Sequence, residues 1–362
     1  MANIKTNISI KNTMSKKPDK DFFLYYRDKK RQIVPFPDNN KQKMAKERLK
    51  ELFFEFSDDL PKKFKDNWTN VKLFNPAGDV DNAHAIILKL EDGSYDLNNK
   101  LNYLTGKEWT MFSCSWFIFN ALKKDLDEER RICENSIDHP ATYSPTMMEG
   151  FIKFFTKEGM SVLDPFAGIG STLVGCARTN RIGYGIELNK KYCRIIIKRV
   201  PEFKANVICG DAVKVKKYFG NNKKFDFSIS SPPYWNVLNR STKDFKAKRV
   251  NGGLDVNYSD DKADLGNIDD YNFFLEKLAG IYFDIYDLLK DGAYITIIVK
   301  NVKKEGKIYP LAWDLAHILS KKYELKDEKI WIQDKVGLAP YGYPSAWASN
   351  ILHHYCLIFK KT

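Results

Sequence analysis

The most restrictive feature of this 362-residue sequence is the alternation, from residue 161 onward, of short apolar runs with segments of helical periodicity. Apolar runs typical of strands cover 161–166, 182–188, 206–212, 224–234, 293–302, 329–333 and 354–360. Segments typical of helices lie between them at 170–180, 273–289 and 311–322. Strands that alternate with helices predict a doubly wound, mostly parallel α/β sheet. The last two strands lie close in sequence, which predicts an antiparallel hairpin at one edge of that sheet.

The residues before this pattern form an N-terminal extension of different composition. Residues 41–56 have the periodicity of an amphipathic helix, and its apolar positions are Met44, Leu49, Leu52 and Phe53. Residues 105–122 are rich in aromatic side chains, which we expect to be buried, and a charged run follows at 123–131. We therefore place a domain boundary within that charged run. It separates an N-terminal basic region, 1–130, from an α/β domain, 131–362.

Charge favours a polyanionic partner for the N-terminal region. The formal net charge is +13, and residues 1–70 hold 17 Lys and Arg against 10 Asp and Glu. A basic excess of this size is typical of proteins that bind nucleic acid. A solubility charge, or the lysine-rich composition of an AT-rich genome, would give the same total. The concentration of the excess near the N-terminus favours a region that faces DNA.

Other features of the sequence point to a cytoplasmic protein. No run of about 18 apolar residues is present, so we expect no transmembrane helix and no membrane partner. The first 20 residues contain no apolar core of a secretory signal. The six cysteines form no C-x-x-C pair, and we expect all of them to be reduced thiols.

Three acidic residues follow three consecutive predicted strands. Asp164 ends the first strand beside a turn that holds Gly168 and Gly170, Glu187 ends the second, and Asp211 ends the third. Ligands of open α/β sheets bind outside the carboxyl ends of the strands, where glycines let the backbone approach closely. A tight turn explains the glycines by themselves, and a loop cap explains one acid. Three acids at three strand ends are better explained by a nucleoside, whose ribose hydroxyls and adenine amino group donate to carboxylates.

The turn after the first strand resembles the cofactor loop of the amino-group DNA methyltransferases, which modify N4 of cytosine or N6 of adenine. The loop residues that carry this resemblance are Asp164, Phe166, Ala167, Gly168, Gly170, Ser171 and Thr172. The resemblance implies a Rossmann-like methyltransferase sheet that binds S-adenosyl-L-methionine. Upstream, His139 and Pro140 match the family's segment that closes over the methionine end of this cofactor.

The fourth predicted strand ends in Ser231-Pro232-Pro233-Tyr234, which resembles the family's Asp/Asn/Ser-Pro-Pro-Tyr catalytic motif. An exocyclic amine is a poor nucleophile because its lone pair is delocalised into the base ring. The Ser231 hydroxyl and the Pro232 carbonyl are two acceptors that hold the amino hydrogens and turn the lone pair out of conjugation. Tyr234 offers a face on which an extruded base stacks. A proline-stiffened turn with an aromatic plug is the purely structural alternative.

Within this family, serine at the first motif position is most associated with N4-cytosine methylation. We therefore expect a site-specific DNA (cytosine-N4) methyltransferase, with N6-adenine as the alternative. The resemblance covers roughly 137–362, and the cofactor loop precedes the catalytic motif, whereas many N4-cytosine enzymes have the opposite order. It also implies double-stranded DNA as partner, a nucleoid location, no metal, and a restriction endonuclease as a candidate companion.

The sequence contains no inserted recognition domain, so target recognition is assigned to three other places. The first is the N-terminal region, 1–130. The second is the basic loop that follows the catalytic motif, with Trp235, Arg240, Lys243, Lys246, Lys248 and Arg249. Its length favours a functional loop over an ordinary solvated one. The third is an aromatic turn at Tyr343, which either lines the base pocket or packs against the sheet edge.

Four other functions compete with this interpretation. An RNA amino-group methyltransferase uses the same two motifs. A protein-glutamine methyltransferase also has a Pro-Pro-Tyr motif but needs no basic surface. A binding protein that kept the fold would lack turnover, whereas both chemical centres are intact here. A nicotinamide-dependent oxidoreductase is disfavoured by the Pro-Pro-Tyr turn.

Overall fold

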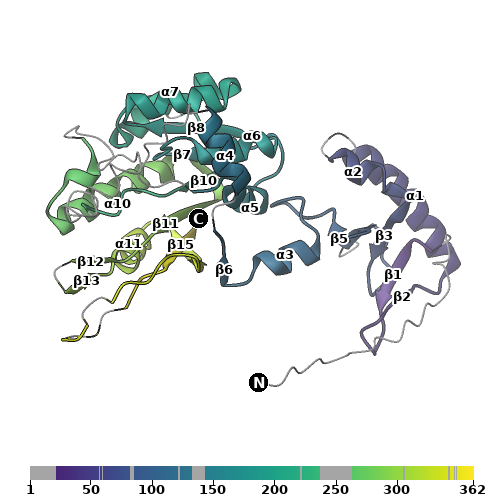
Figure 1. The fold of residues 1–362 in the computed structure, drawn as a ribbon. Coiled ribbons are helices and arrows are strands. Elements are labelled where there is room, and N and C mark those ends of the chain that lie inside the picture. The colour runs from purple at the N-terminus through teal and green to yellow at the C-terminus, as the bar shows by residue number, and fades with distance from the viewer. Residues whose placement is uncertain are drawn as a thin grey trace. The chain divides into compact units, whose positions relative to one another are not determined.

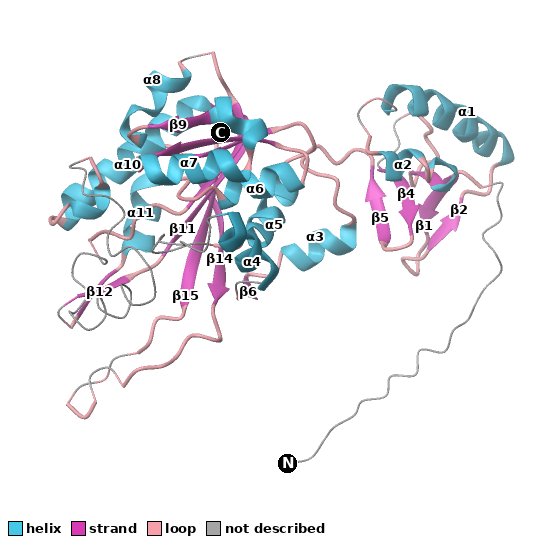
Figure 2. Cartoon of the chain, turned by 45° about the horizontal axis from the view of Figure 1, so that its top comes forward, coloured by secondary structure: helices cyan, strands magenta, loops and turns pink. Residues whose placement is uncertain are grey.

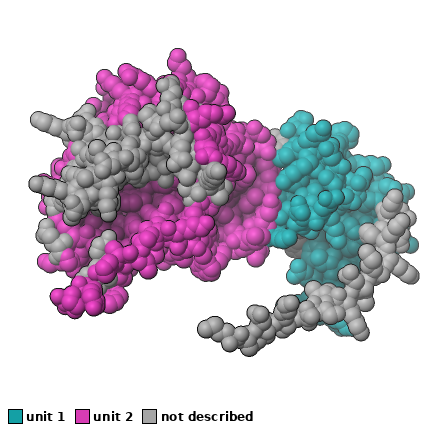
Figure 3. Space-filling model, viewed as in Figure 1, with its two compact units in different colours: residues 1–100, 105–107 teal, residues 101–104, 108–362 magenta. Residues whose placement is uncertain are grey.

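The computed structural model describes residues 22–56, 58, 60–81, 85–120, 123–132, 143–220, 222–236, 263–304, 306–340, 343–345, 347 and 349–362. The chain divides into two compact units (Figure 3). Unit 1 comprises residues Met1–Lys100 and Thr105–Lys107, and unit 2 comprises Leu101–Leu104 and Glu108–Thr362. No helix among the described residues is long and apolar enough to cross a membrane.

Unit 1 is built on a sheet that a long helix covers. Within the described residues the strand order is β2-β1-β3-β4-β5, with bounds Ile33–Pro35, Leu24–Arg27, Val71–Phe74, Ala85–Leu90 and Gly93–Asp96. Helix α1 (Asn39–Phe56) buries Ala45, Leu49 and Leu52, and a short helix α2 spans Lys62–Lys65. The Gln42 amide oxygen accepts hydrogen bonds from the N–H groups of Phe23 and Leu24, which ties α1 to β1. Met44, which we predicted to be an apolar contact of this helix, is instead 53% exposed.

Unit 2 contains the predicted doubly wound sheet (Figure 1). Its order is β6-β14-β15-β11-β10-β7-β8-β9 over the described part of the chain. These strands span, in chain order, Trp116–Ile118 (β6), Ser161–Asp164 (β7), Ile182–Glu187 (β8), Val207–Cys209 (β9), Phe225–Ser230 (β10), Leu289–Val299 (β11), Glu324–Ile332 (β14) and His353–Lys360 (β15). Strands β9, β8, β7, β10 and β11 pair in parallel, and β15 runs antiparallel to both β11 and β14. The predicted fold class, including the antiparallel pair of β14 and β15, is therefore confirmed.

Helices cover both faces of this sheet (Figure 2). They span Gly106–Phe112 (α3), Lys123–Ile132 (α4), Pro145–Phe155 (α5), Ser171–Arg178 (α6), Lys190–Arg199 (α7), Val215–Phe219 (α8), Tyr271–Leu288 (α10) and Leu311–Leu319 (α11). A small hairpin of β12 (Val302–Lys304) and β13 (Lys307–Tyr309) lies before α11. Successive residues of β11 point to opposite faces, so Ile297 packs with α10 and α11, and Ile298 packs with α5.

Strand β6 was not predicted, and it changes the edge of the sheet. It pairs in parallel with β14, so β6 rather than the β14–β15 pair is outermost. The aromatic segment around it is less buried than expected, since Trp109 is 38% exposed and Trp116 is 52% exposed. Phe112 nevertheless stacks on Phe154 at 4.1 Å between ring centroids. The segment therefore has one packed side and one exposed side.

The expectation that all cysteines are free differs from the structure, in which Cys193 and Cys209 form a disulfide. These residues lie 16 positions apart, in α7 and at the end of β9. They meet because α7 returns the chain to the strand beside β8, a contact that no local spacing reveals. Cys114, Cys176 and Cys356 are free thiols, and Cys133 lies outside the described residues.

The units divide earlier than the boundary placed in the charged run, because α3 from Glu108 onward, β6 and α4 belong to unit 2. Asp125 of α4 is 2% exposed and connects this helix to its neighbours. Its carboxylate accepts hydrogen bonds from the hydroxyls of Ser144 and Thr146 at the start of α5. It also pairs with the Arg178 guanidinium of α6 at 3.0 Å.

We expect Asp125→Ala to lower the free energy of unfolding by roughly 2–4 kcal/mol, because it removes a buried acceptor from an arginine and two hydroxyls. The matched control is Asp127→Ala, because Asp127 is exposed on the same helix. Urea unfolding of the full chain measures both variants. Equal stabilities for the two would show that Asp125 does not hold α4 in place.

Candidate active site

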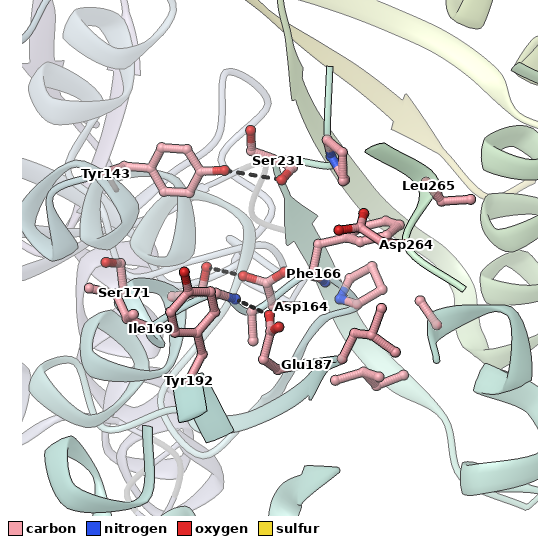
Figure 4. A pocket seen from close by; sticks show the side chains of 18 of the residues that line it. Tyr143, Asp164, Phe166, Ile169, Ser171, Glu187, Tyr192, Ser231, Asp264 and Leu265 are labelled. Atoms are coloured by element: carbon pink, nitrogen blue, oxygen red, sulfur yellow. Dashed lines mark hydrogen bonds between the residues drawn. The ribbon is translucent and has the colours of Figure 1, made fainter. Parts of the chain in front are cut away.

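A cavity of about 270 Å³ lies at the carboxyl ends of β7, β8, β9 and β10 (Figure 4). The loop after β7, the start of the loop after β10, and the facing ends of β14 and β15 also contribute to its wall. Every lining residue belongs to unit 2. The acids Asp164, Glu187 and Asp211 lie together in this cavity with Ser231 and Tyr234 of the proline-rich turn.

Asp164 holds the glycine loop that follows β7. The carboxylate is 1% exposed, and it accepts hydrogen bonds from the Phe166 N–H at 3.0 Å and the Thr172 hydroxyl at 2.6 Å. Gly170, which precedes α6, has φ of 89°, and a Cβ atom there would lie 3.0 Å from the Ile196 side chain. A side chain at Gly170 would therefore be strained by the backbone conformation, and the Ile196 side chain would have to shift to admit it.

Glu187 connects this glycine loop to the end of β8. One carboxylate oxygen accepts the Gly168 N–H at 2.8 Å, and the other accepts the Asn189 N–H at 2.7 Å. Figure 4 shows Glu187 beneath the loop, with its carboxylate turned toward the cavity. Each carboxylate oxygen retains a second lone pair, which a hydroxyl group of a ligand can use.

Asp211 lies at the third strand end. Its carboxylate accepts the Val213 N–H at 2.9 Å, and its own N–H donates to the Tyr218 hydroxyl at 3.1 Å. The backbone of the preceding Gly210 approaches Tyr218 closely, because a Cβ atom there would lie 2.3 Å from the Tyr218 hydroxyl and would displace that ring. The turn is thereby fixed with the Asp211 side chain at the cavity.

Burial perturbs the two central acids. Burial raises the pKa of Asp164 to about 7, although hydrogen bonds from Thr172 and Phe166 oppose the shift. Burial also raises the pKa of Glu187 to about 8, against hydrogen bonds from Asn189 and Gly168, and the nearby Asp164 charge adds to the rise. Buried carboxylates with raised pKa values favour a ligand that brings hydrogen-bond donors.

The proline-rich turn faces these acids. The Ser231 and Tyr234 hydroxyls are 2.9 Å apart, and the Tyr143 hydroxyl donates to the Ser231 carbonyl at 3.3 Å (Figure 4). Tyr143 comes from the residues just before α5, so a distant segment fixes the turn. Pro233 also lines the cavity. The structure thus brings both predicted centres, the acid-and-glycine site and the proline-rich turn, into one pocket.

Sequence reasoning missed several residues of this pocket. Asp264 is 6% exposed and accepts the Gly266 N–H at 2.8 Å, and it faces the cavity from beyond the long loop. Tyr143, Trp331, Gln333 and His354 also line the cavity. Their local sequence has no pattern that marks a site, because the fold brings them to the cavity from other strands and loops. The one local sequence signal was the Asp-x-Gly pattern at 264–266, in which Asp264 caps a short helical turn.

Some predicted residues lie elsewhere. Trp235 is 2% exposed and packs against Tyr271 and Tyr309, so the structure places it in the core rather than in a position to contact nucleic acid. Tyr343 is 83% exposed and does not line the cavity. Gly170 and Pro232 do not line the cavity themselves, but the residues on either side of each do. The predicted residues His139, Pro140, Arg240, Lys243, Lys246, Lys248 and Arg249 lie outside the described residues.

Comparison with known proteins gives a family match. Residues 3–198 match the family model described as DNA methylase, a match that includes the glycine loop and ends before the proline-rich turn. The orphan methyltransferase M.BamHII of Bacillus amyloliquefaciens is 28% identical over 51% of this chain and 62% of its own length. The Type II methyltransferase M.BglI of Bacillus subtilis is 31% identical over 28% of this chain and 26% of its own. The matched segments thus span less than two-thirds of each relative.

Among solved structures, TrmN from Thermus thermophilus is 15% identical, with a TM-score of 0.40 over 65% of this chain and 53% of its own. At this TM-score the similarity does not define the fold, which follows from the strand order itself.

We expect the free energy of unfolding to fall as pH rises from about 4.5 to about 8, the ordinary and folded-state pKa values of Glu187. In that window the folded chain keeps a proton that the unfolded chain has released, so each step up in pH favours unfolding. Asp164 contributes in the same direction. Glu187→Gln removes one of the two groups and should make the decline shallower. Urea unfolding at pH 5, 6.5 and 8.5 measures both slopes, and parallel curves would contradict the assignment.

Proposed function

The chain belongs to the DNA methylase family, and we propose that it transfers a methyl group from S-adenosyl-L-methionine to an exocyclic amino group of a base in double-stranded DNA. One observation carries the proposal. The three strand-end acids and the Ser231–Tyr234 turn line the same cavity, so a nucleoside cofactor and a base bind within reach of each other. A turn with only a structural role would not need to face the three strand-end acids.

The residues present fit the cofactor. Asp164 and Glu187 are buried acids that need donors, and the ribose hydroxyls and ammonium group of S-adenosyl-L-methionine are donors. We assign the ribose to Glu187 and the adenine amino group to Asp211. We assign the loop of residues 164–172, with Phe166 and Ser171 on the cavity wall, to the rest of the cofactor. When bound, the cofactor supplies a methyl group attached to a positively charged sulfur.

The Ser231–Tyr234 turn is proposed to prepare the amine. The Ser231 hydroxyl and the Pro232 carbonyl accept the two amino hydrogens, which turns the nitrogen lone pair toward the cavity. The hydroxyl of Tyr234, 2.9 Å from that of Ser231, holds the serine in place. Tyr143 fixes the backbone of the turn through the Ser231 carbonyl. The nitrogen would gain the positive charge as its bond to the methyl carbon forms and the carbon–sulfur bond breaks, and it would lose that charge by releasing one proton to solvent.

The acceptor base is proposed to be cytosine, with methylation at N4, because the turn begins with serine. A neutral hydroxyl accepts from an adenine amino group equally well, so N6-adenine stays the alternative. An extruded base reaches the turn only after leaving the duplex stack. Tyr234, which lines the cavity, is the surface on which such a base is proposed to stack.

Target recognition is proposed to involve unit 1 and the exposed turn at Tyr343. In unit 1, a groove beside α1 combines the aromatic rings of Phe53 and Trp68 with Lys46 and Lys50. Aromatic rings interleaved with basic side chains are typical of nucleic-acid contacts. Double-stranded DNA is the proposed partner of the whole chain.

We expect Ser231→Ala to lower kcat at least about 100-fold, because one of two amino-group acceptors is lost, with affinity for S-adenosyl-L-methionine within about twofold of wild type. Asp164→Ala should instead abolish the binding of S-adenosyl-L-methionine, which calorimetry measures. Transfer of labelled methyl to mixed-sequence duplex DNA, followed by nucleoside chromatography, measures turnover and identifies the base.

Label in N4-methylcytosine supports the full proposal, and label in N6-methyladenine supports the alternative base. Label only in RNA or protein would overturn the DNA substrate while leaving the cofactor site. Full activity of Ser231→Ala would remove that serine from the mechanism.

A further inference from the structure

One wall of the cavity is not used by the acids or by the Ser231–Tyr234 turn. It is formed by Trp331 and Gln333 at the end of β14 and by His354 at the start of β15. Trp331 and His354 are direct partners in the antiparallel pairing of the two strands. Because β15 runs against the parallel strands, its beginning lies at the same sheet edge as the carboxyl ends of the others. The antiparallel direction of β15 in the sheet therefore places this wall at the cavity.

Aromatic contacts join this wall to the proposed catalytic turn. The rings of Trp331 and His354 stack with centroids 4.4 Å apart and an interplanar angle of 23°. His354 lies 5.8 Å from the Tyr234 ring, and Trp331 lies 6.3 Å from the Tyr143 ring, again between centroids. Both tyrosines contact Ser231 through their hydroxyls. A planar ring held at Ser231 is thus within the reach of this aromatic wall.

His354 carries a polar atom that the protein does not satisfy. The residue is 8% exposed, and its Nδ1 is buried with no hydrogen-bond partner among the described residues. Buried ring nitrogens are normally paired, and an unpaired one in a residue that lines a cavity points to a ligand. Burial lowers the pKa of His354 to about 3, with further lowering by Lys300 and His353, so the ring is neutral at pH 7. A neutral imidazole offers one N–H and one lone pair, which match the edge of a nucleobase.

We propose that His354 and Trp331 form the subsite that holds the extruded base, and that His354 hydrogen-bonds the base through its Nδ1. This inference rests on the proposed function and extends it from the amine to the ring that carries it. The stacked Trp331 ring fixes the imidazole plane. Gln333, at the end of β14, lines the same cavity and adds an amide to that wall.

Three substitutions of His354 separate its roles. Phenylalanine keeps a ring to stack on Trp331 but removes both nitrogens. Asparagine places its amide near the position of Nδ1, whereas glutamine places its amide near Nε2. The matched control is His353→Asn, because His353 is the neighbouring residue of β15 and does not line the cavity.

We expect His354→Phe to lower kcat/KM for genomic DNA about 10- to 100-fold, the effect of one lost hydrogen bond in a desolvated site. Affinity for S-adenosyl-L-methionine in calorimetry should stay within about twofold, because the cofactor acids are untouched. His354→Asn should recover most of the loss, and His354→Gln should not. Thermal unfolding checks that each variant is folded, and the asparagine variant keeps the test valid if the phenylalanine variant is not.

The two proposals fail in different ways. If wild type methylates no DNA, the proposed function is overturned, and the base subsite falls with it. If wild type is active and His354→Phe is equally active, only the base subsite is overturned. Equal recovery by asparagine and glutamine would overturn the assignment to Nδ1, as would an equal loss in His353→Asn.

Discussion

The hydrogen bond from the Gly168 N–H to the Glu187 carboxylate is the interaction on which the site depends. It joins the loop after β7 to the end of β8, next to the backbone hydrogen bond from the Ala167 N–H to the Ile186 carbonyl. Asp164 holds the other end of the same loop through Phe166 and Thr172. Two acids therefore hold the loop and also line the cavity. Their raised pKa values reflect this arrangement, since the site buries carboxylates whose remaining lone pairs face a cavity.

Much of the fold could be predicted because its elements have strong local patterns. The strands that became β7, β8 and β10 are short apolar runs, and α10 has clear helical periodicity. Strand β6 could not be predicted, because three residues with two exposed side chains have no apolar alternation of their own. It forms only because β14, more than 200 positions later, offers backbone groups for pairing.

The candidate site also contains some residues that the local sequence predicts and others that only the fold reveals. Asp164, Glu187 and Asp211 could be placed because the ends of parallel strands meet at one edge of a sheet, so position along the chain implies position in space. His354 and Trp331 could not, because their place in the cavity depends on β15 entering the sheet in the opposite direction. For Trp235, the local sequence suggested a contact with nucleic acid, whereas the fold buries its side chain. It follows a catalytic-type motif, yet its ring fills the core between Tyr271 and Tyr309.

The antiparallel course of β15 has one more consequence. Since β14 ends and β15 begins at the cavity edge, the segment between Ile332 and His353 both leaves and re-enters the sheet beside the cavity. None of the described residues between Ile332 and His353 takes part in the pairing of these strands or in the core clusters on the two faces of the sheet. The pairing of β14 with β15 therefore sets no limit of its own on the length or composition of this segment.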